Sequence, residues 1–378
     1  MPGEVQRRDV RSLADILAVA PWTALEEHIS DLRERIDSAV LASHTRRAAL
    51  RHEILTESPE LRRRVRRPTP EALRWAKNLL ATGVVAAADG TVAAVPLLSG
   101  TKIQVGVVIV TNTGNSVQLV TRVFEHELTN QGETARQFFE NLRHVHGSSN
   151  LASRALMLFG ERTLLLDQPA DWRMIHGELI PFELRTGVGQ PAENLPPVFE
   201  LVRRYVGDQR FIAVSEGPED LEVLNASIIL EPGEFIEIRM LSDDLSMFLD
   251  GDQNAGTTRA GFNNIDRESF RRFIGEVGPE VAIVLVKAGH RPYLLECHRE
   301  RVAQAVALFL ADALWTRGLP DRGAAVTARG FPFHIDLADS VARTLFKSGE
   351  FRGFVEARLM ELGVEAGITD LDPRRTRR

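Results

Sequence analysis

Acidic residues suited to binding metal ions are scattered along this sequence rather than grouped in one motif. Asp89 follows a strand-like segment, Glu161 lies in a helix-like segment, and Asp339 lies far downstream in another. Carboxylates from distant parts of a chain can converge on two divalent cations, which stabilise the attacking and leaving oxygens of a phosphodiester. Metal-dependent phosphodiester hydrolysis is therefore one chemistry that these residue types could perform, provided that the fold brings them together.

The first two candidates also have purely structural explanations. Asp89 is followed by Gly90, and an Asp-Gly pair is a strong signal for a tight turn. Arg154 and Glu161 are seven residues apart, close to two helical turns, so they share one helix face. A helix that forms salt bridges at the protein surface would show the same spacing.

The C-terminal candidates lie after an aromatic-Pro-aromatic segment at 331–333. Asp336 and Asp339 are three residues apart, so both can lie on one side of a helix. Acidic residues near a helix N-terminus are favoured by the helix dipole in any case. We take Asp339 as the candidate ligand and Asp336 as its neighbour. Arg343, one turn further on, could bind a phosphate or pair with Asp339.

A run of arginines could guide a nucleic acid strand. It precedes a Pro-Thr-Pro break and a short helix-like segment with Trp75, and it comprises Arg62, Arg63, Arg64, Arg66 and Arg67. Cationic residues beside an aromatic ring are typical of single-strand-binding surfaces. A solvated helix face or an interdomain linker would look the same. The net charge of -6 does not favour nucleic acid, so the local distribution of charge matters more than the sum.

The hydrophobic pattern predicts an α/β fold. Residues 24–55 have the spacing of one long amphipathic helix. Strands are predicted at 84–88, 102–111, 117–124, 171–176, 211–214, 226–230, 235–240, 281–286 and 293–297. A short helix with Trp75 is predicted after the Pro-Thr-Pro break within residues 58–80, and further helices are predicted at 133–144, 151–166, 197–206, 270–274, 299–315, 335–347 and 352–362. A turn is expected at 112–115.

Three consecutive strands, then helices, then a strand beside the first is the order of a ribonuclease H-like sheet. We therefore expect a mixed central sheet flanked by helices, with an N-terminal helical extension. The predicted parts are a basic helical extension at 1–80, a catalytic domain at 81–350, and a C-terminal helix and tail at 351–378.

Four short motifs resemble those of the NurA nuclease family. That pattern has Asp-Gly-Ser after an early strand, a helix with Arg and then Glu, a strand ending in Asp-Gly-x-Leu, and a late Gly-Tyr-Pro-Tyr followed by Ala-Asp or Ala-His. The corresponding residues here are Asp89-Gly90-Thr91, Arg154 with Glu161, His176-Gly177-Glu178-Leu179, and Gly330-Phe331-Pro332-Phe333 leading to Ala338-Asp339. The resemblance extends from about residue 83 to residue 345.

The resemblance implies a fold like ribonuclease H and the Piwi domain, and a Mn²⁺- or Mg²⁺-dependent exonuclease or single-strand endonuclease. Its implied catalytic and metal-binding residues are Asp89, Glu161, His176 and Asp339. It further implies a homodimer that acts on DNA with a hexameric HerA-like ATPase, in DNA end processing or defence against phage. The alternative is a catalytically weak or inactive subunit that binds and regulates such an ATPase.

The third motif departs from the family, which usually has Asp where this chain has His176. Histidine is an acceptable Mn²⁺ ligand and can act on a leaving-group proton. Another register uses Asp167, with Glu140 or Glu133 as the helix ligand. We prefer His176 because residues 171–180 have the pattern of a strand running into a glycine turn, whereas Asp167 lies at a helix end.

Other classes of site are disfavoured. A lone cysteine, Cys297, cannot form an intrachain disulfide and is expected beside a strand in the core. His126, His144 and His146 lack the spacing of a zinc site. Residues 250–256 lack the Gly and Glu of a calcium loop and are expected to form an acidic loop, and residues 186–190 lack the Lys of a phosphate-binding loop. Without a membrane-spanning run or a secretory signal, the chain is expected in the cytoplasm.

Overall fold

The computed structural model describes two compact units that divide after Pro59. The described residues are 25–95, 102–111, 113–114, 116–124, 135–216, 226–254, 262–289, 291–315, 331–346 and 348–362. In the first unit, the predicted long helix is confirmed as α2, Leu25–Glu57. The proposed domain boundary at residue 80 lies within the second unit, inside the last turn of helix α4, Pro70–Ala81.

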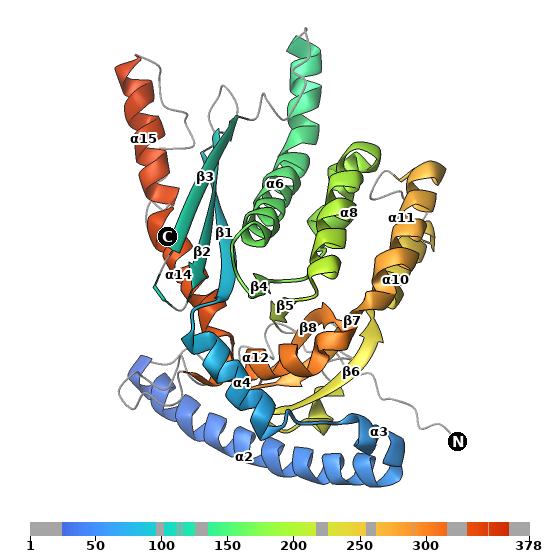
Figure 1. Ribbon diagram of the computed structural model, residues 1–378. Helices are drawn as coiled ribbons and strands as arrows, with labels where there is room; N and C mark the ends of the chain where they lie inside the picture. Colours follow the sequence, from blue (N-terminus) through green and yellow to red (C-terminus); the bar gives the residue numbers. More distant parts are fainter. Residues whose placement is uncertain are drawn as a thin grey trace, which may run out of the picture. The chain divides into compact units, whose positions relative to one another are not determined.

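The second unit is built on an eight-stranded sheet in the order β3-β2-β1-β4-β5-β8-β7-β6 (Figure 1). Its strands are β1 Val85–Val95, β2 Lys102–Thr111, β3 Ser116–Phe124, β4 Trp172–His176, β5 Phe211–Glu216, β6 Glu234–Met240, β7 Val281–Lys287 and β8 Pro292–His298. The β1–β4 and β4–β5 pairs are parallel and the other pairs are antiparallel. The predicted ribonuclease H-like mixed sheet, with a fourth strand beside the first, is confirmed.

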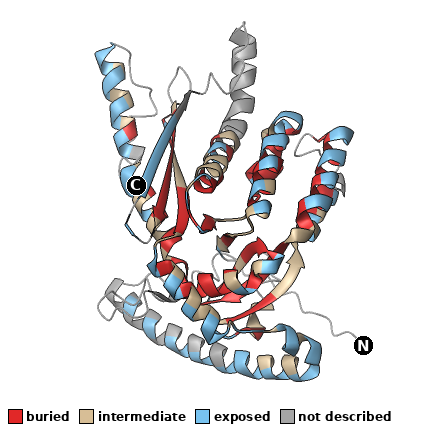
Figure 2. Cartoon of the chain, in the orientation of Figure 1, coloured by how far each residue is buried: buried red, intermediate tan, exposed pale blue. Residues whose placement is uncertain are grey.

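Helices cover both faces of the sheet, because the strands bury side chains on both sides. Val85, Ala87 and the alternate residues of β4 and β5 pack against α4 Pro70–Ala81, α12 Val302–Trp315 and α14 Phe333–Leu345. The intervening residues pack against α6 Ala135–Leu166, α8 Pro191–Asp208, α10 Leu241–Asn254 and α11 Asn264–Val277. Figure 2 shows the buried residues gathered in the sheet and on the helix faces turned toward it.

Short elements complete this unit. They are α3 Pro59–Arg64, α7 Phe182–Arg185, α15 Ser348–Glu361, and the 3₁₀ turns η1 Gly187–Gly189, η2 Ser227–Ile229, η3 Gly278–Glu280 and η4 Arg299–Arg301. Phe351 of α15 packs against Ala93 and Val95, in the half of β1 that extends beyond β4. Within the described residues, no helix is both long and apolar enough to cross a membrane.

Three predicted elements differ from the structure. The predicted strand at 226–230 is wrong: Leu230 N–H donates to Ser227 O in the η2 turn, and Lys287 Nζ donates to Leu230 O. Those two bonds satisfy the N–H and the carbonyl of Leu230 without a sheet partner. The two helices predicted within 133–166 form the single helix α6. A glycine between them does not interrupt it, because glycine lowers the stability of a helix by only about 1 kcal/mol relative to alanine. Residues 250–254 belong to α10 rather than to a loop, while 255–256 lie outside the described residues.

Candidate metal-binding site

Asp89 lies in the interior of β1 and is 6% exposed. The turn interpretation of Asp89-Gly90 is therefore wrong, since Asp89 pairs with Val108 of β2 within a continuous ladder. Parallel pairing between β1 and β4 ends one residue earlier, at Ala88 and Ile175. Asp89 thus lies beside the carboxyl end of β4, within β1, and open α/β sheets place their ligand sites at such strand ends.

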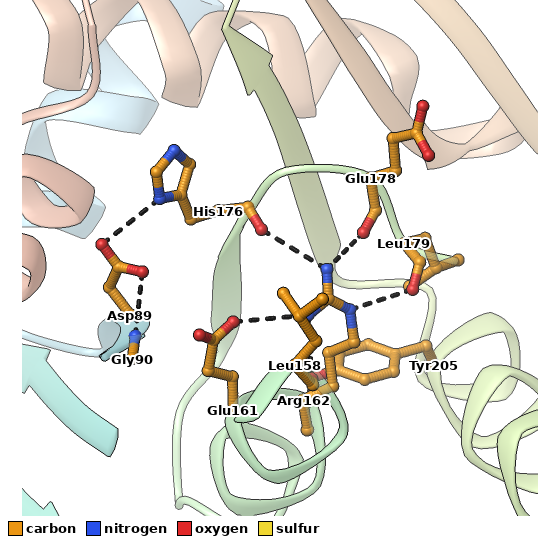
Figure 3. Close-up of polar contacts among 9 residues, drawn as sticks. All are labelled: Asp89, Gly90, Leu158, Glu161, Arg162, His176, Glu178, Leu179 and Tyr205. Carbon is orange, nitrogen blue, oxygen red and sulfur yellow. Dashed lines mark hydrogen bonds and ion pairs between the residues drawn. The ribbon is translucent and has the colours of Figure 1, made fainter. Parts of the chain in front are cut away.

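His176 is the last residue of β4 and contacts Asp89 directly (Figure 3). Trp172 and Met174 lie in the core under α4, α12 and α14, so strand alternation places His176 on the same sheet face as Asp89. The distance from His176 Nδ1 to Asp89 Oδ2 is 3.2 Å. Since a carboxylate accepts, Nδ1–H donates and the lone pair of the imidazole is on Nε2.

Glu161 reaches the same region from α6 and is 2% exposed. A Cβ atom built on Gly90 would lie 2.5 Å from Glu161 Oε1 and 2.7 Å from Met157 Cγ. Gly90 therefore follows Asp89 because only glycine leaves room for the Glu161 carboxylate beside β1. Oε1 has no hydrogen-bond partner among the described residues, although it is fully buried.

We expect Gly90→Ala to displace Glu161 and lower the free energy of unfolding by about 1–3 kcal/mol, the usual cost of overpacking a dense core. Thermal unfolding followed by circular dichroism measures this loss. Gly207→Ala is the matched control, because a Cβ there would meet nothing within 4 Å. Equal melting temperatures for Gly90→Ala and the control would contradict the close approach of Glu161 to β1.

Arg162, next to Glu161, is 1% exposed and binds the turn that follows β4. Its Nε donates to Leu179 O at 3.0 Å, and its Nη2 donates to Glu178 O and to His176 O. Its Nη1 lies 3.3 Å from Glu161 Oε2. One guanidinium thereby fixes the backbone that carries His176 and partly neutralises Glu161.

Burial and neighbouring charges shift the pKa values of two of these groups. Burial raises the pKa of Glu161 to about 8; Arg162 opposes this shift and Asp89 adds to it. Burial alone would lower the pKa of His176, but the hydrogen bond and charge of Asp89 outweigh it and raise that pKa above its ordinary value. The shift of Glu161 therefore reflects its burial, whereas the shift of His176 reflects the carboxylates around it.

The donor chemistry fits a divalent cation, because carboxylate oxygen and imidazole nitrogen both bind Mn²⁺. An unpaired, buried Glu161 oxygen beside Asp89 and His176 is the position where a cation would supply the missing charge. In the described part of the chain, however, no three His, Cys, Asp or Glu side chains already converge as metal ligands. Binding would therefore require side-chain rotation.

Asp339 and Arg343 lie on α14 and pair with each other. Arg343 Nε donates to Asp339 Oδ1 at 2.6 Å. Of the two uses foreseen for Arg343, pairing with the carboxylate is the one observed. Asp339 stays a proposed ligand, on a helix that packs against β1. Asp336 likewise lies on α14, and Gly330 of the same motif lies outside the described residues.

The alternative ligands take other positions. Asp167 is 54% exposed and pairs with Arg204 at 2.8 Å, beside α8. Glu133 and the Glu140 side chain lie outside the described residues, as do His126 and the side chains of His144 and His146. Cys297 is buried in β8, as predicted.

Three arginines of the predicted strand-guiding run bind the edge of the sheet instead of projecting freely. Arg66 exchanges two backbone hydrogen bonds with Phe235 of β6, and its side chain pairs with Glu237. Arg64 donates to Glu237 O, and Arg67 pairs with Glu231 and Glu234. The run thus covers the β6 edge, which would otherwise expose unpaired backbone groups. Arg62 and Arg63 lie on α3.

Arg154 was selected because it shares a helix face with Glu161, but it is 63% exposed and pairs with Glu183 at 2.8 Å. The buried arginine of the site is Arg162, which sequence reasoning missed. The only feature of the sequence that marks Arg162 is its position next to Glu161, and that position does not predict that its side chain is buried.

Comparison with solved structures returns NurA nucleases, the family whose motifs the sequence resembles. The NurA nuclease from Sulfolobus solfataricus is 11% identical at a TM-score of 0.43, over 73% of this chain and 84% of that one. A NurA bound to dAMP and manganese is 12% identical at a TM-score of 0.41, over 90% and 98%. Endonuclease V from Bacillus subtilis is 9% identical at a TM-score of 0.31, over 76% and 92%. No family model and no curated protein matches the sequence.

Proposed function

We propose that this protein is a metal-dependent deoxyribonuclease whose site contains Asp89, Glu161 and His176, with Asp339 as a fourth residue. The observation that supports this most strongly is the fully buried Glu161 oxygen without a partner, beside the Asp89–His176 pair. Burying a carboxylate oxygen that accepts no hydrogen bond costs free energy. A bound cation would offset that cost, so the arrangement is better explained by a ligand than by stability.

Each residue has a distinct role in this proposal. Asp89, Glu161, His176 and Asp339 would hold Mn²⁺ or Mg²⁺, which when bound supplies positive charge and lowers the pKa of water. Asp89 orients the imidazole through Nδ1, so His176 Nε2 can bind the cation or hold a proton near the leaving oxygen. Arg162 keeps Glu161 and the turn after β4 in place.

DNA contacts are proposed for the exposed arginines around the site. Arg154 and Arg343 are 63% and 75% exposed, and each forms a surface ion pair. Such pairs contribute about 0–1 kcal/mol, so a phosphate can replace the carboxylate at little cost. Arg62 and Arg63 remain in the proposal, whereas Arg64, Arg66 and Arg67 would first have to leave the β6 edge.

The assembly proposed from the motif resemblance is a cytoplasmic homodimer that receives DNA from a hexameric HerA-like ATPase. Its exonuclease or single-strand endonuclease activity would then serve DNA end processing or defence against phage. An ATPase gene of this type next to the gene for this chain would support the pairing.

The test is degradation of DNA by the full chain. We expect linear DNA to be degraded with Mn²⁺ or Mg²⁺, no degradation with a chelator, and recovery when Mn²⁺ is added back. Linear and circular substrates, resolved on gels over time, separate exonuclease from endonuclease activity. Cleavage that persists in chelator, or no cleavage with either ion even beside a HerA-like ATPase, would overturn the proposal.

The second candidate is a catalytically weak or inactive subunit that binds and regulates a HerA-like ATPase. Two observations favour it: His176 stands where the family usually has Asp, and no three ligands converge among the described residues. Unchanged DNA degradation by a complex with the ATPase, after replacement of both Asp89 and Asp339, would identify this role.

A further inference from the structure

Glu216, the last residue of β5, extends the row of candidate ligands across a third parallel strand. β5 pairs in parallel with β4, and His176 is level with Val214. Ile212 and Val214 pack in the core under α4, α12 and α14. Strand alternation therefore places Glu216 on the sheet face that carries Asp89 and His176.

β5 continues past the point where β4 ends. Gly177 has φ of +78° and turns the chain away from the sheet, while its N–H donates to Val214 O at 2.8 Å. On the other side, Glu216 pairs with Tyr293 of β8, so its backbone remains within the sheet. Neighbouring strands are about 4.8 Å apart and two residues rise about 6.6 Å, so roughly 8 Å separate the Cα atoms of His176 and Glu216. Two long side chains at that spacing can reach one ion.

We propose that Glu216 is a further metal-binding carboxylate of this site, on the side of His176 away from Asp89. This inference rests on the proposed nuclease function and adds a residue to it. Asp89 occupies Nδ1 of His176, which leaves Nε2 as the ring nitrogen that can bind a cation. Metal-bound histidines usually donate their other ring N–H to a carboxylate, which is the role that Asp89 has here.

Two further observations support this assignment. The charge of Glu216 acts on the His176 imidazole, so the two side chains lie within electrostatic range of each other. The charges of Asp89 and Glu161 act on the same imidazole, so three carboxylates lie within electrostatic range of His176. A divalent cation between His176 and Glu216 would balance part of that negative charge.

The experiment measures Mn²⁺ binding to the full-length protein without DNA, by titration followed with electron paramagnetic resonance. We expect Glu216→Gln to weaken Mn²⁺ binding about tenfold or more, since even residues that only support a ligand contribute 10–100-fold. Glu216→Asp, which keeps the charge on a shorter side chain, should fall between Gln and the unmodified protein. Glu268→Gln is the matched control, because Glu268 is 78% exposed on α11, across the sheet.

The outcomes separate this inference from the proposed function. Mn²⁺ binding by the unmodified protein that Glu216→Gln leaves unchanged overturns the role of Glu216 alone. Absence of Mn²⁺ binding in the unmodified protein overturns both. A loss of affinity in Glu216→Gln, with melting temperature and Glu268→Gln unaffected, supports the assignment.

Discussion

Replacing Asp89 with asparagine should reduce metal-dependent DNA degradation by about 10²–10³-fold and leave the fold intact. Asparagine preserves the size of the side chain and can still accept a hydrogen bond from Gly90 N–H or His176 Nδ1–H. It removes the negative charge that binds a cation and that stabilises a positively charged imidazole. A bound cation provides several kcal/mol of transition-state stabilisation, and each 1.36 kcal/mol corresponds to a tenfold change in rate.

The measurement is the initial rate of linear DNA degradation in Mn²⁺, together with a thermal melt. Asp171→Asn is the control, because Asp171 is 56% exposed and pairs with Arg210 outside the site. We expect this control to degrade DNA at the unmodified rate. If Asp89→Asn kept its activity within a factor of about three, which is less than 1 kcal/mol, Asp89 would have no role in catalysis.

The proximity of Asp89 and His176 could be predicted from the sequence, because each residue belongs to a short segment with a recognisable strand pattern. Each follows a run of buried residues, and strands that run in parallel bring their carboxyl ends to one edge. The glycine turn after His176 marked the end of β4 correctly. The predicted position of Asp89, after the end of its strand, was wrong. β1 continues to Val95 because it pairs with β2 that far, and this pairing is a tertiary contact.

Helix periodicity placed Arg154 and Glu161 on one helix face, but the arginine that contacts Glu161 is Arg162. Seven residues correspond to about 10 Å along a helix, so residues on one face can have very different surroundings. Glu161 lies beside β1, whereas Arg154 reaches Glu183 of α7. Burial of Arg162 depends on the turn at 176–179 folding around it, which is a long-range contact that no local pattern encodes.

For a related reason, the sequence could not predict which residue of α14 faces the sheet. Successive helix residues differ by about 100° in direction, so a small rotation about the axis decides whether Ala338 or Asp339 faces the sheet. Ala338 is buried there and Asp339 pairs with Arg343. Only the packing of the whole helix on β1 and β2 determines that rotation.

Replacing Arg162 with alanine should cost about 3–5 kcal/mol of unfolding free energy, which is the usual loss when one member of a buried ion pair is removed. The substitution leaves buried Glu161 without the cation beside it, and it removes the donors to the carbonyls of Leu158, His176 and Leu179. Urea unfolding at pH 7 measures the loss.

Two further variants separate the effect of the Arg162 charge from the effect of its donor geometry. They are Arg162→Lys and the surface control Arg154→Ala. Lysine keeps the positive charge but not the planar fork of donors, so Arg162→Lys should unfold at a urea concentration between those of Arg162→Ala and the unmodified protein. Arg154 lies on the same helix and forms a surface pair, so its replacement should cost less than about 1 kcal/mol. If Arg162→Ala were no less stable than Arg154→Ala, the turn carrying His176 would be held by other contacts, such as Glu296 Oε2 accepting from Leu179 N–H at 2.6 Å. The site would then be organised from β8 rather than from α6.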